Sequence, residues 1–140
     1  MARRLRDERG ASAVEFALIV PLLIMLVLGI AEFGHAFQVQ GTLSAAAREG
    51  VRTMALQNDA AAARTAVRTA ASSLSPAVTD LQIDIRVVTG TAPPLNPPVC
   101  PTTGGNSNVR VTISYRMPYL TGFFGSGLTL SGTGVMRCNG

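Results

Sequence analysis

The stretch RGASAVEFALIVPLLIMLVLGIAEFGHAF (residues 9–37) decides how the chain is organised. It contains no charged residue from Phe16 to Ala31, and its apolar body is roughly 20 to 27 residues long. A helix rises 1.5 Å per residue, so this body would reach about 30 to 40 Å, which is enough to cross a bilayer. We therefore predict a transmembrane helix over residues 11–37.

Three residues inside this stretch bear on the shape of the helix or on its contacts with other helices. Pro21 would break a helix in water, but in a membrane we expect a kink at most. Gly29 and Gly34 are small positions at which another helix could approach closely.

The charge distribution predicts the orientation of this helix. The formal net charge of +4 comes from arginine alone, since the chain has no lysine. Four arginines precede the apolar run, with Asp7 and Glu8 among them, and such a flank is typical of the cytoplasmic side. A nucleic-acid-binding tail is the alternative, but no later basic patch with interleaved aromatic residues supports it. We therefore expect a cytoplasmic N-terminus and no nucleic-acid partner.

The two cysteines, Cys100 and Cys138, both follow the predicted span. A cytoplasmic N-terminus would place them outside the cytoplasm, where disulfides persist. A bridge across this separation would contribute about 4 kcal/mol in the chain-entropy model. We predict a Cys100–Cys138 disulfide, with two unpaired thiols as the alternative.

Residues 38–75 read as an amphipathic helical segment. Thr42 to Leu56 carries apolar and small residues at helical spacing, and it either continues the membrane helix as a stalk or begins anew after a bend at Gly41 and Thr42. Asn58 or Asp59 should begin a second helix that ends near Leu74. The two expected stripes are Leu43, Ala47, Gly50, Val51 and Met54, and then Ala63, Val67, Ala70, Ala71 and Leu74.

Period-two alternation replaces the helical pattern in residues 76–140, which we expect to be an extracytoplasmic β-rich region. Strands are predicted at 81–87, 109–117 and 128–136, the last one weakened by glycine. The proline-rich stretch between the first two should be an extended, exposed loop. The fold class is therefore α+β, a transmembrane helix and helical stalk followed by a small antiparallel sheet whose apolar face a helix covers.

No constellation of catalytic residues is present. His35 is the only histidine and lies at the end of the apolar run, far in sequence from both cysteines. No glycine-rich phosphate loop follows a strand and opens a helix. We expect no enzyme activity, no cofactor, no metal and no small-molecule substrate.

Glu15 does not fit a plain membrane anchor. A carboxylate inside a span costs about 3 kcal/mol at the centre and less near the edge. In one interpretation Glu15 is hydrated at the cytoplasmic interface. In the other, the chain is cut after Gly10, and the new amine of Ala11 and the Glu15 carboxylate neutralise each other, within one helix or between neighbours in a bundle.

This arrangement resembles the processing site of type IV pilin-like proteins: Arg9-Gly10, then Ala11-Ser-Ala-Val-Glu15-Phe16, then an apolar run. More narrowly, residues 9–37 look like the start of TadE-like proteins, the minor pseudopilins of the Tad (tight adherence) pilus system. The stretch AAAREGVR (residues 45–52) resembles a second segment common in that family. The resemblance covers about residues 9–55.

The resemblance implies that a prepilin peptidase removes residues 1–10 as a leader and reads Gly10 and Glu15. The product would be a minor pseudopilin or assembly factor of a Tad pilus, which serves adhesion and biofilm formation. Its partners would be membrane lipid, the peptidase, other Tad pilins and pseudopilins, and the assembly platform. Glu32 matches a recurrent feature of the family, with interfacial solvation as the alternative. The assembly helix would include Phe16, Pro21, Gly29, Glu32 and Gly34.

The resemblance implies a single-pass protein of the cytoplasmic (inner) membrane and leaves open whether it enters the pilus. Two other functions compete with a pseudopilin. One is an unprocessed membrane anchor that displays a small disulfide-tied binding domain. The other is a secreted module released by signal peptidase near Ala31 or Ala36, against which Glu15 and the length of the apolar run argue.

Overall fold

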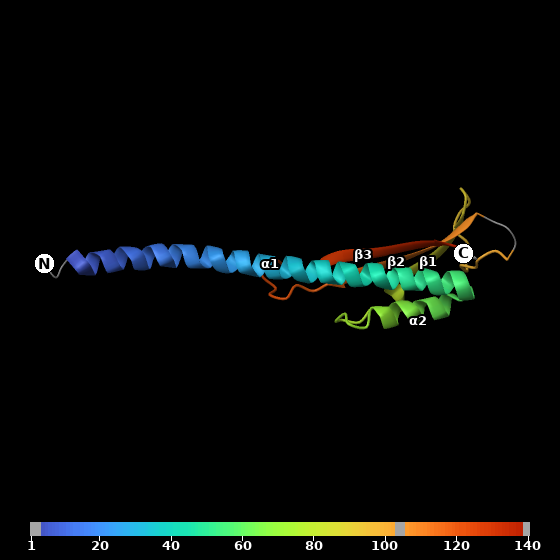
Figure 1. Cartoon of the computed structure of the whole chain (residues 1–140), viewed down its shortest axis with the longest axis horizontal. Coiled ribbons are helices and arrows are strands. Elements are labelled where there is room, and N and C mark those ends of the chain that lie inside the picture. The colour runs from blue at the N-terminus through green and yellow to red at the C-terminus, as the bar shows by residue number, and fades with distance from the viewer. Residues whose placement is uncertain (1–3, 103–105, 139–140) are drawn as a thin grey trace. The chain divides into compact units, whose positions relative to one another are not determined.

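The computed structural model describes residues 4–102 and 106–138, with side chains from Gly10 onward. The chain divides into two compact units, Met1–His35 and Ala36–Gly140. Two α-helices are followed by a 3-10 turn and three strands, so the predicted α+β class is confirmed (Figure 1). The elements are α1 (Arg4–Gln57), α2 (Ala60–Ala70), η1 (Asp80–Gln82), β1 (Ile83–Thr89), β2 (Ser107–Met117) and β3 (Leu128–Arg137).

The first helix, α1, is continuous for 54 residues and passes through Pro21. A bend or new helix start at Gly41 and Thr42 is therefore wrong, and the alternative of a continuous stalk is confirmed. The reason is local, because the Thr42 hydroxyl donates to the Gln38 carbonyl one turn earlier at 3.1 Å. A hydroxyl that donates to the preceding turn makes its hydrogen bond within the same helix, so it does not cap the start of a new helix.

The second helix, α2, begins as predicted and ends early. The Asp59 carboxylate accepts hydrogen bonds from the amides of Ala61 (2.8 Å) and Ala62 (3.2 Å), so Asp59 is its N-cap. The helix ends at Ala70 rather than near Leu74, and Ala70 is exposed, which corrects the predicted stripe. The two serines that follow favour turns over helix, and the chain turns there, so that Leu74 is still buried.

The three strands form an antiparallel sheet in the order β1-β2-β3. The predicted alternation holds in β1 and β2, whose odd-numbered residues from Ile83 to Val87 and from Val109 to Met117 are buried. Leu81 is the exception, because it lies in η1 and is fully exposed. A capping box between Thr79 and Gln82 forms this turn and delays the strand until Ile83.

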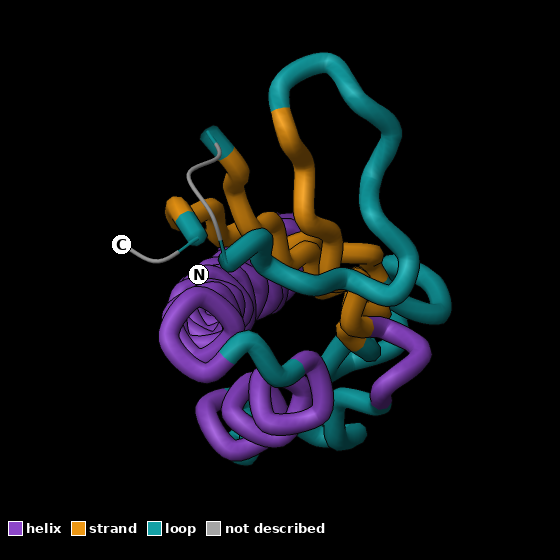
Figure 2. The backbone as a smooth tube through the Cα atoms, turned by 90° about the vertical axis from the view of Figure 1, so that its right-hand side faces the viewer, coloured by secondary structure: helices purple, strands orange, loops and turns teal. Residues whose placement is uncertain are grey.

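The sheet packs on α1 through small residues. At Gly132 of β3, an added Cβ would lie 2.5 Å from the carbonyl carbon and oxygen of Leu43, and at Gly134 it would lie 2.7 Å from the Ala47 oxygen. At Gly50 of α1, it would lie 2.5 Å from Val67 of α2. The glycines of β3 are therefore the contact between strand and helix, where the sequence suggested only a weakened strand. Figure 2 shows α1 and α2 side by side, with the strands against them.

Tyr115 connects the sheet to the segment that follows α2. Its hydroxyl donates to the Pro76 carbonyl at 2.9 Å, and its ring is buried in the core. Desolvation by this burial raises the pKa of Tyr115 above its ordinary value of 10.0. The neutral phenol is therefore the form that the folded state favours.

We expect Tyr115→Phe to lower the free energy of unfolding by about 1 kcal/mol, because Pro76 loses its donor. Since the pKa is raised in the folded state, the contribution of Tyr115 is fully present below pH 10 and declines as the pH rises further. Urea unfolding of the full chain in a mild detergent at pH 8 and at pH 11 checks both effects. If the free energy of unfolding falls equally from pH 8 to pH 11 in wild type and in Tyr115→Phe, the pH dependence does not come from Tyr115.

Candidate functional site

The N-terminal part of α1 exposes large apolar side chains around its whole circumference. A window of 18 residues in this helix has a mean hydropathy of 2.7, and none of it is buried. Length and composition would let this helix cross a membrane. The exposed residues are Val14, Phe16, Leu18, Ile19, Leu22, Leu23, Ile24, Met25, Leu26, Val27, Ile30 and Phe33.

The predicted processing residues lie together on one face of α1. Gly10, Ala11, Val14, Glu15 and Leu18 line the same shallow surface depression. Ala11 and Glu15 are four residues apart, and residues at this spacing are neighbours on a helix surface. All five are exposed, and a Cβ at Gly10 would meet no atom within 4 Å. The Gly10–Ala11 bond and the Glu15 carboxylate can therefore be contacted together from one side.

Gly29 and Gly34 have no packing role that the described structure accounts for. A Cβ at either position would meet nothing within 4 Å. Glycine inside a helix costs up to about 1 kcal/mol relative to alanine, so its presence at two open positions needs another cause. Close approach of a second helix remains our prediction for both.

Glu32 differs from Glu15 in its surroundings. Glu15 is exposed, whereas only 5% of the Glu32 surface is exposed. The residues on either side of Glu32, Ala31 and Phe33, are exposed. The role of Glu32 in assembly stays a prediction.

Comparison with known protein families finds a similarity over this part of the chain. Residues 10–52 match the family model of TadE-like proteins. The resemblance inferred from the sequence is thereby confirmed over these residues. Comparison with curated proteins and with solved structures finds no match.

The TadE-like match suggests a Tad pilus-associated protein, and this family is one of pilus components rather than enzymes. It implies contact with the membrane and with other pilus components. The apolar helix and the pilus family together fit a membrane-anchored protein. The match begins at Gly10 and ends at Arg52, within α1, so α2 and the sheet lie outside the TadE-like segment.

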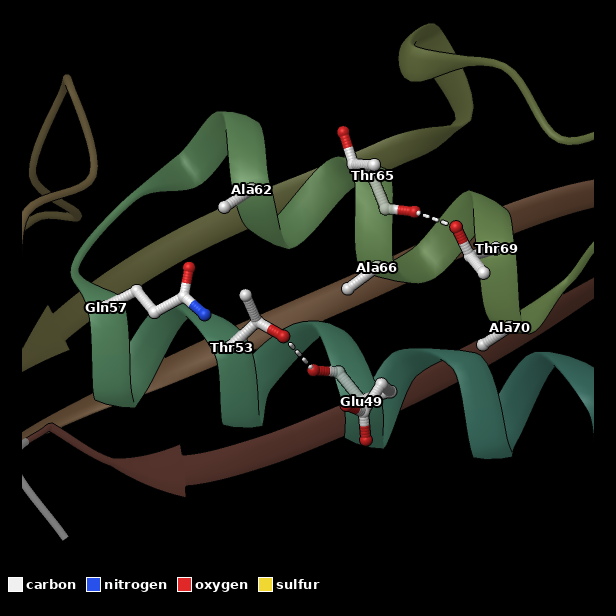
Figure 3. A pocket seen from close by; sticks show the side chains of 8 residues that line it. All are labelled: Glu49, Thr53, Gln57, Ala62, Thr65, Ala66, Thr69 and Ala70. Carbon is white, nitrogen blue, oxygen red and sulfur yellow. Dashed lines mark hydrogen bonds between the residues drawn. The ribbon is translucent and has the colours of Figure 1, made fainter.

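A groove runs between α1 and α2, at the C-terminal end of the TadE-like match (Figure 3). Its threonines are already satisfied, because Thr53 donates to the Glu49 carbonyl, Thr65 to Ala61 and Thr69 to Thr65. Glu49 and Gln57 supply its remaining polar groups, and alanine forms the rest. We therefore assign the groove to helix packing rather than to a ligand.

The predicted disulfide is present. Cys100 and Cys138 are bonded, which joins the loop after β1 to the end of β3. The Asn58 side chain adds a second attachment, because its oxygen accepts from the Cys100 amide (2.6 Å) and its nitrogen donates to the Cys100 carbonyl (3.2 Å). Sequence reasoning assigned Asn58 only to helix capping and did not detect this contact.

The outer face of the sheet carries arginines from all three strands, which sequence reasoning also missed. Arg86 of β1 lies directly opposite Arg110 of β2, and Arg137 of β3 pairs with the next outward residue, Asn108. The carboxylate on this face is Asp84, which pairs with Arg86. The alternating sequence pattern predicts that these side chains point outward, but only the register of the strands shows that they are neighbours. Such a face suits water or an acidic partner and not hydrocarbon.

Metal-ligating groups do not gather in the described residues. Within residues 10–102 and 106–138, whose side chains are described, no three of His, Cys, Asp and Glu are grouped so that they could hold an ion. His35 is half-exposed in α1.

Proposed function

We propose that this protein is a minor pseudopilin or assembly factor of a Tad-type pilus. Its N-terminus would be cytoplasmic, its apolar helix would sit in the cytoplasmic membrane, and residues 36–140 would lie outside the cytoplasm. The observation that carries the proposal is the placement of Gly10, Ala11 and Glu15 on one exposed face at the start of a membrane-length helix. The TadE-like match over residues 10–52 supports it.

In this proposal, a prepilin peptidase cuts between Gly10 and Ala11. The new α-amine would then lie one turn from the Glu15 carboxylate. Each charge would lower the free-energy cost of burying the other in the membrane. The same pair formed between neighbouring subunits would set their axial register. Gly29 and Gly34 would let the helices approach, so that the subunit joins a helical bundle with other Tad pilins or pseudopilins on the assembly platform.

Replacing Gly10 by leucine should abolish leader removal while leaving the fold intact. The open space around Gly10 means that the side chain itself disturbs nothing in the chain. Intact mass of the protein from cells that contain the peptidase checks this. Gly41→Leu is the matched control, since Gly41 is also helical and open, and it should be processed like wild type. Processing of Gly10→Leu at the wild-type rate would contradict the cleavage site.

Replacing Glu15 by leucine should leave the protein in the membrane but reduce its assembly at least about ten-fold, the effect expected if a charge pair in a low dielectric is lost. Glu15→Gln keeps the shape and removes the charge, so it should assemble as poorly. Co-purification with the other pilus components from the native host measures assembly. If Glu15→Leu assembles as well as wild type, Glu15 does not set the register.

The same experiments separate the alternative function, an unprocessed anchor that displays a disulfide-tied domain. Such an anchor would keep residues 1–10 in wild type and would be indifferent to both substitutions.

A further inference from the structure

The connection between β2 and β3, residues 118–127, carries a cluster of exposed apolar side chains, and we name it the aromatic loop. Leu120 is 62% exposed, Phe123 70% and Phe124 54%. Tyr119 packs edge-on against Phe124, with their ring centroids 6.3 Å apart. Single exposed apolar residues are common on protein surfaces, but a cluster of this kind marks a contact with another apolar phase.

The register of β3 on α1 places this loop at one end of the Ala36–Gly140 unit. The Gln40 side chain donates to the Ser131 carbonyl at 2.8 Å, Gly132 lies against Leu43, and Gly134 lies against Ala47. Strand and helix therefore run in the same direction (Figure 1). Leu128 begins β3 about 13 Å before Gly132, a distance that corresponds to about eight or nine helix residues. The aromatic loop thus lies at the end where α1 begins in this unit, near Ala36.

This end directly follows the apolar run in the sequence. The unit contains three phenylalanines, Phe37, Phe123 and Phe124, and all of them are exposed and at this end. The opposite end holds the proline-rich loop, whose exposed large hydrophobic residues are the aliphatic Leu95 and Val99. Exposed aromatic surface in this unit is therefore confined to the end that holds Ala36, the first residue of the unit after the apolar run in the sequence.

We propose that the aromatic loop inserts into the phospholipid interface on the side of the membrane where the Ala36–Gly140 unit lies. This inference rests on the proposed membrane anchoring of α1. Aromatic and leucine side chains favour the boundary between headgroups and acyl chains. Arg116 donates to Ser126 at 2.7 Å, which places a guanidinium beside the loop. A guanidinium at this depth pairs well with lipid phosphate.

Insertion would give the unit a second attachment besides its covalent link to α1. Two attachments restrict the unit's rotation about the helix axis and fix which face it turns outward. The arginine-bearing outer face of the sheet would then keep a defined orientation relative to the membrane, available to acidic partners.

The chain has no tryptophan, so one introduced tryptophan is an unambiguous probe. We would prepare three full-length variants, Phe123→Trp in the aromatic loop, Leu95→Trp as the exposed control at the opposite end, and Ile24→Trp in the apolar run. Each is reconstituted into vesicles of phosphatidylcholine and phosphatidylglycerol, with and without brominated acyl chains. All three positions are exposed, so the substitutions do not disturb the core.

We expect brominated lipid to quench Trp at 24 strongly and Trp at 123 at least about two-fold, with a blue-shifted emission for both, as for side chains in or at the bilayer. Trp at 95 should emit as in water and stay unquenched. Quenching at 24 without quenching at 123 would overturn the loop insertion and leave membrane anchoring intact. Absence of quenching at 24 would remove the membrane anchoring, and this inference with it.

Discussion

Replacing Gly132 by valine is expected to lower the free energy of unfolding of the Ala36–Gly140 unit by about 3 kcal/mol, at the upper end for overpacked cores. A Cβ at this position would lie 2.5 Å from the carbonyl carbon and oxygen of Leu43. These are backbone atoms of a helix, so no rotamer change relieves the clash. Strand β3 would have to move away from α1, which would expose the buried residues between them.

Urea unfolding of the full chain in a mild detergent, followed by circular dichroism, measures this loss. Gly41→Ala is the matched control, because Gly41 lies in α1 with no neighbouring atom within 4 Å of an added Cβ. It should be neutral or stabilising by up to about 1 kcal/mol, since alanine favours helix. Equal unfolding midpoints for wild type and Gly132→Val would mean that β3 does not pack on α1 at this glycine.

Removing the disulfide is expected to have a comparable effect, about 4 kcal/mol, because Cys100 and Cys138 are 38 residues apart and their bond restricts the unfolded chain. The double substitution of Cys100→Ser and Cys138→Ser avoids leaving a reactive thiol. The Asn58 hydrogen bonds still hold residue 100 in the folded state. The loss should therefore appear as reduced stability rather than as a changed fold.

Protease resistance and urea unfolding, each with and without reductant, check this prediction. Wild type should lose stability on reduction, and the double variant should be unaffected by reductant. A wild-type protein that unfolds at the same urea concentration in both conditions would contradict the stabilising role of the bridge.

Those parts of the fold that depend on short-range patterns could be predicted from the sequence. The apolar run, the Asp59 cap and the alternation in β1 and β2 each depend on neighbours a few residues away. Errors occurred where a competing local interaction decided the outcome. Thr42 bonds back into α1, and the Thr79–Gln82 capping box removes Leu81 from β1.

Features that depend on contacts between distant residues could not be predicted. In the sequence, the glycines of β3 only indicate a strand of low stability. The structure shows that they allow the strand to pack closely against Leu43 and Ala47 of α1. The opposition of Arg86 and Arg110 needs the strand register. The same is true of the aromatic loop, whose residues are plain in the sequence but whose position beside the start of the unit is not.

For the candidate site, the sequence places Ala11 and Glu15 four residues apart, and a helix makes residues at this spacing neighbours on one face. The role of Gly10, Ala11 and Glu15 in processing stays a prediction. The disulfide was predictable because the chain has only two cysteines. The hydrogen bonds of Asn58 to Cys100 could not be predicted, since the two residues are 42 positions apart in the sequence.

Cleavage between Gly10 and Ala11 distinguishes a pseudopilin from a plain membrane anchor. The most direct test is the N-terminal sequence and intact mass of the protein taken from the membrane fraction of its native host. We expect a chain that begins at Ala11. A chain that begins at Met1 or Ala2 would contradict prepilin processing and leave an unprocessed anchor, and one that begins beyond Ala31 would contradict membrane anchoring as well.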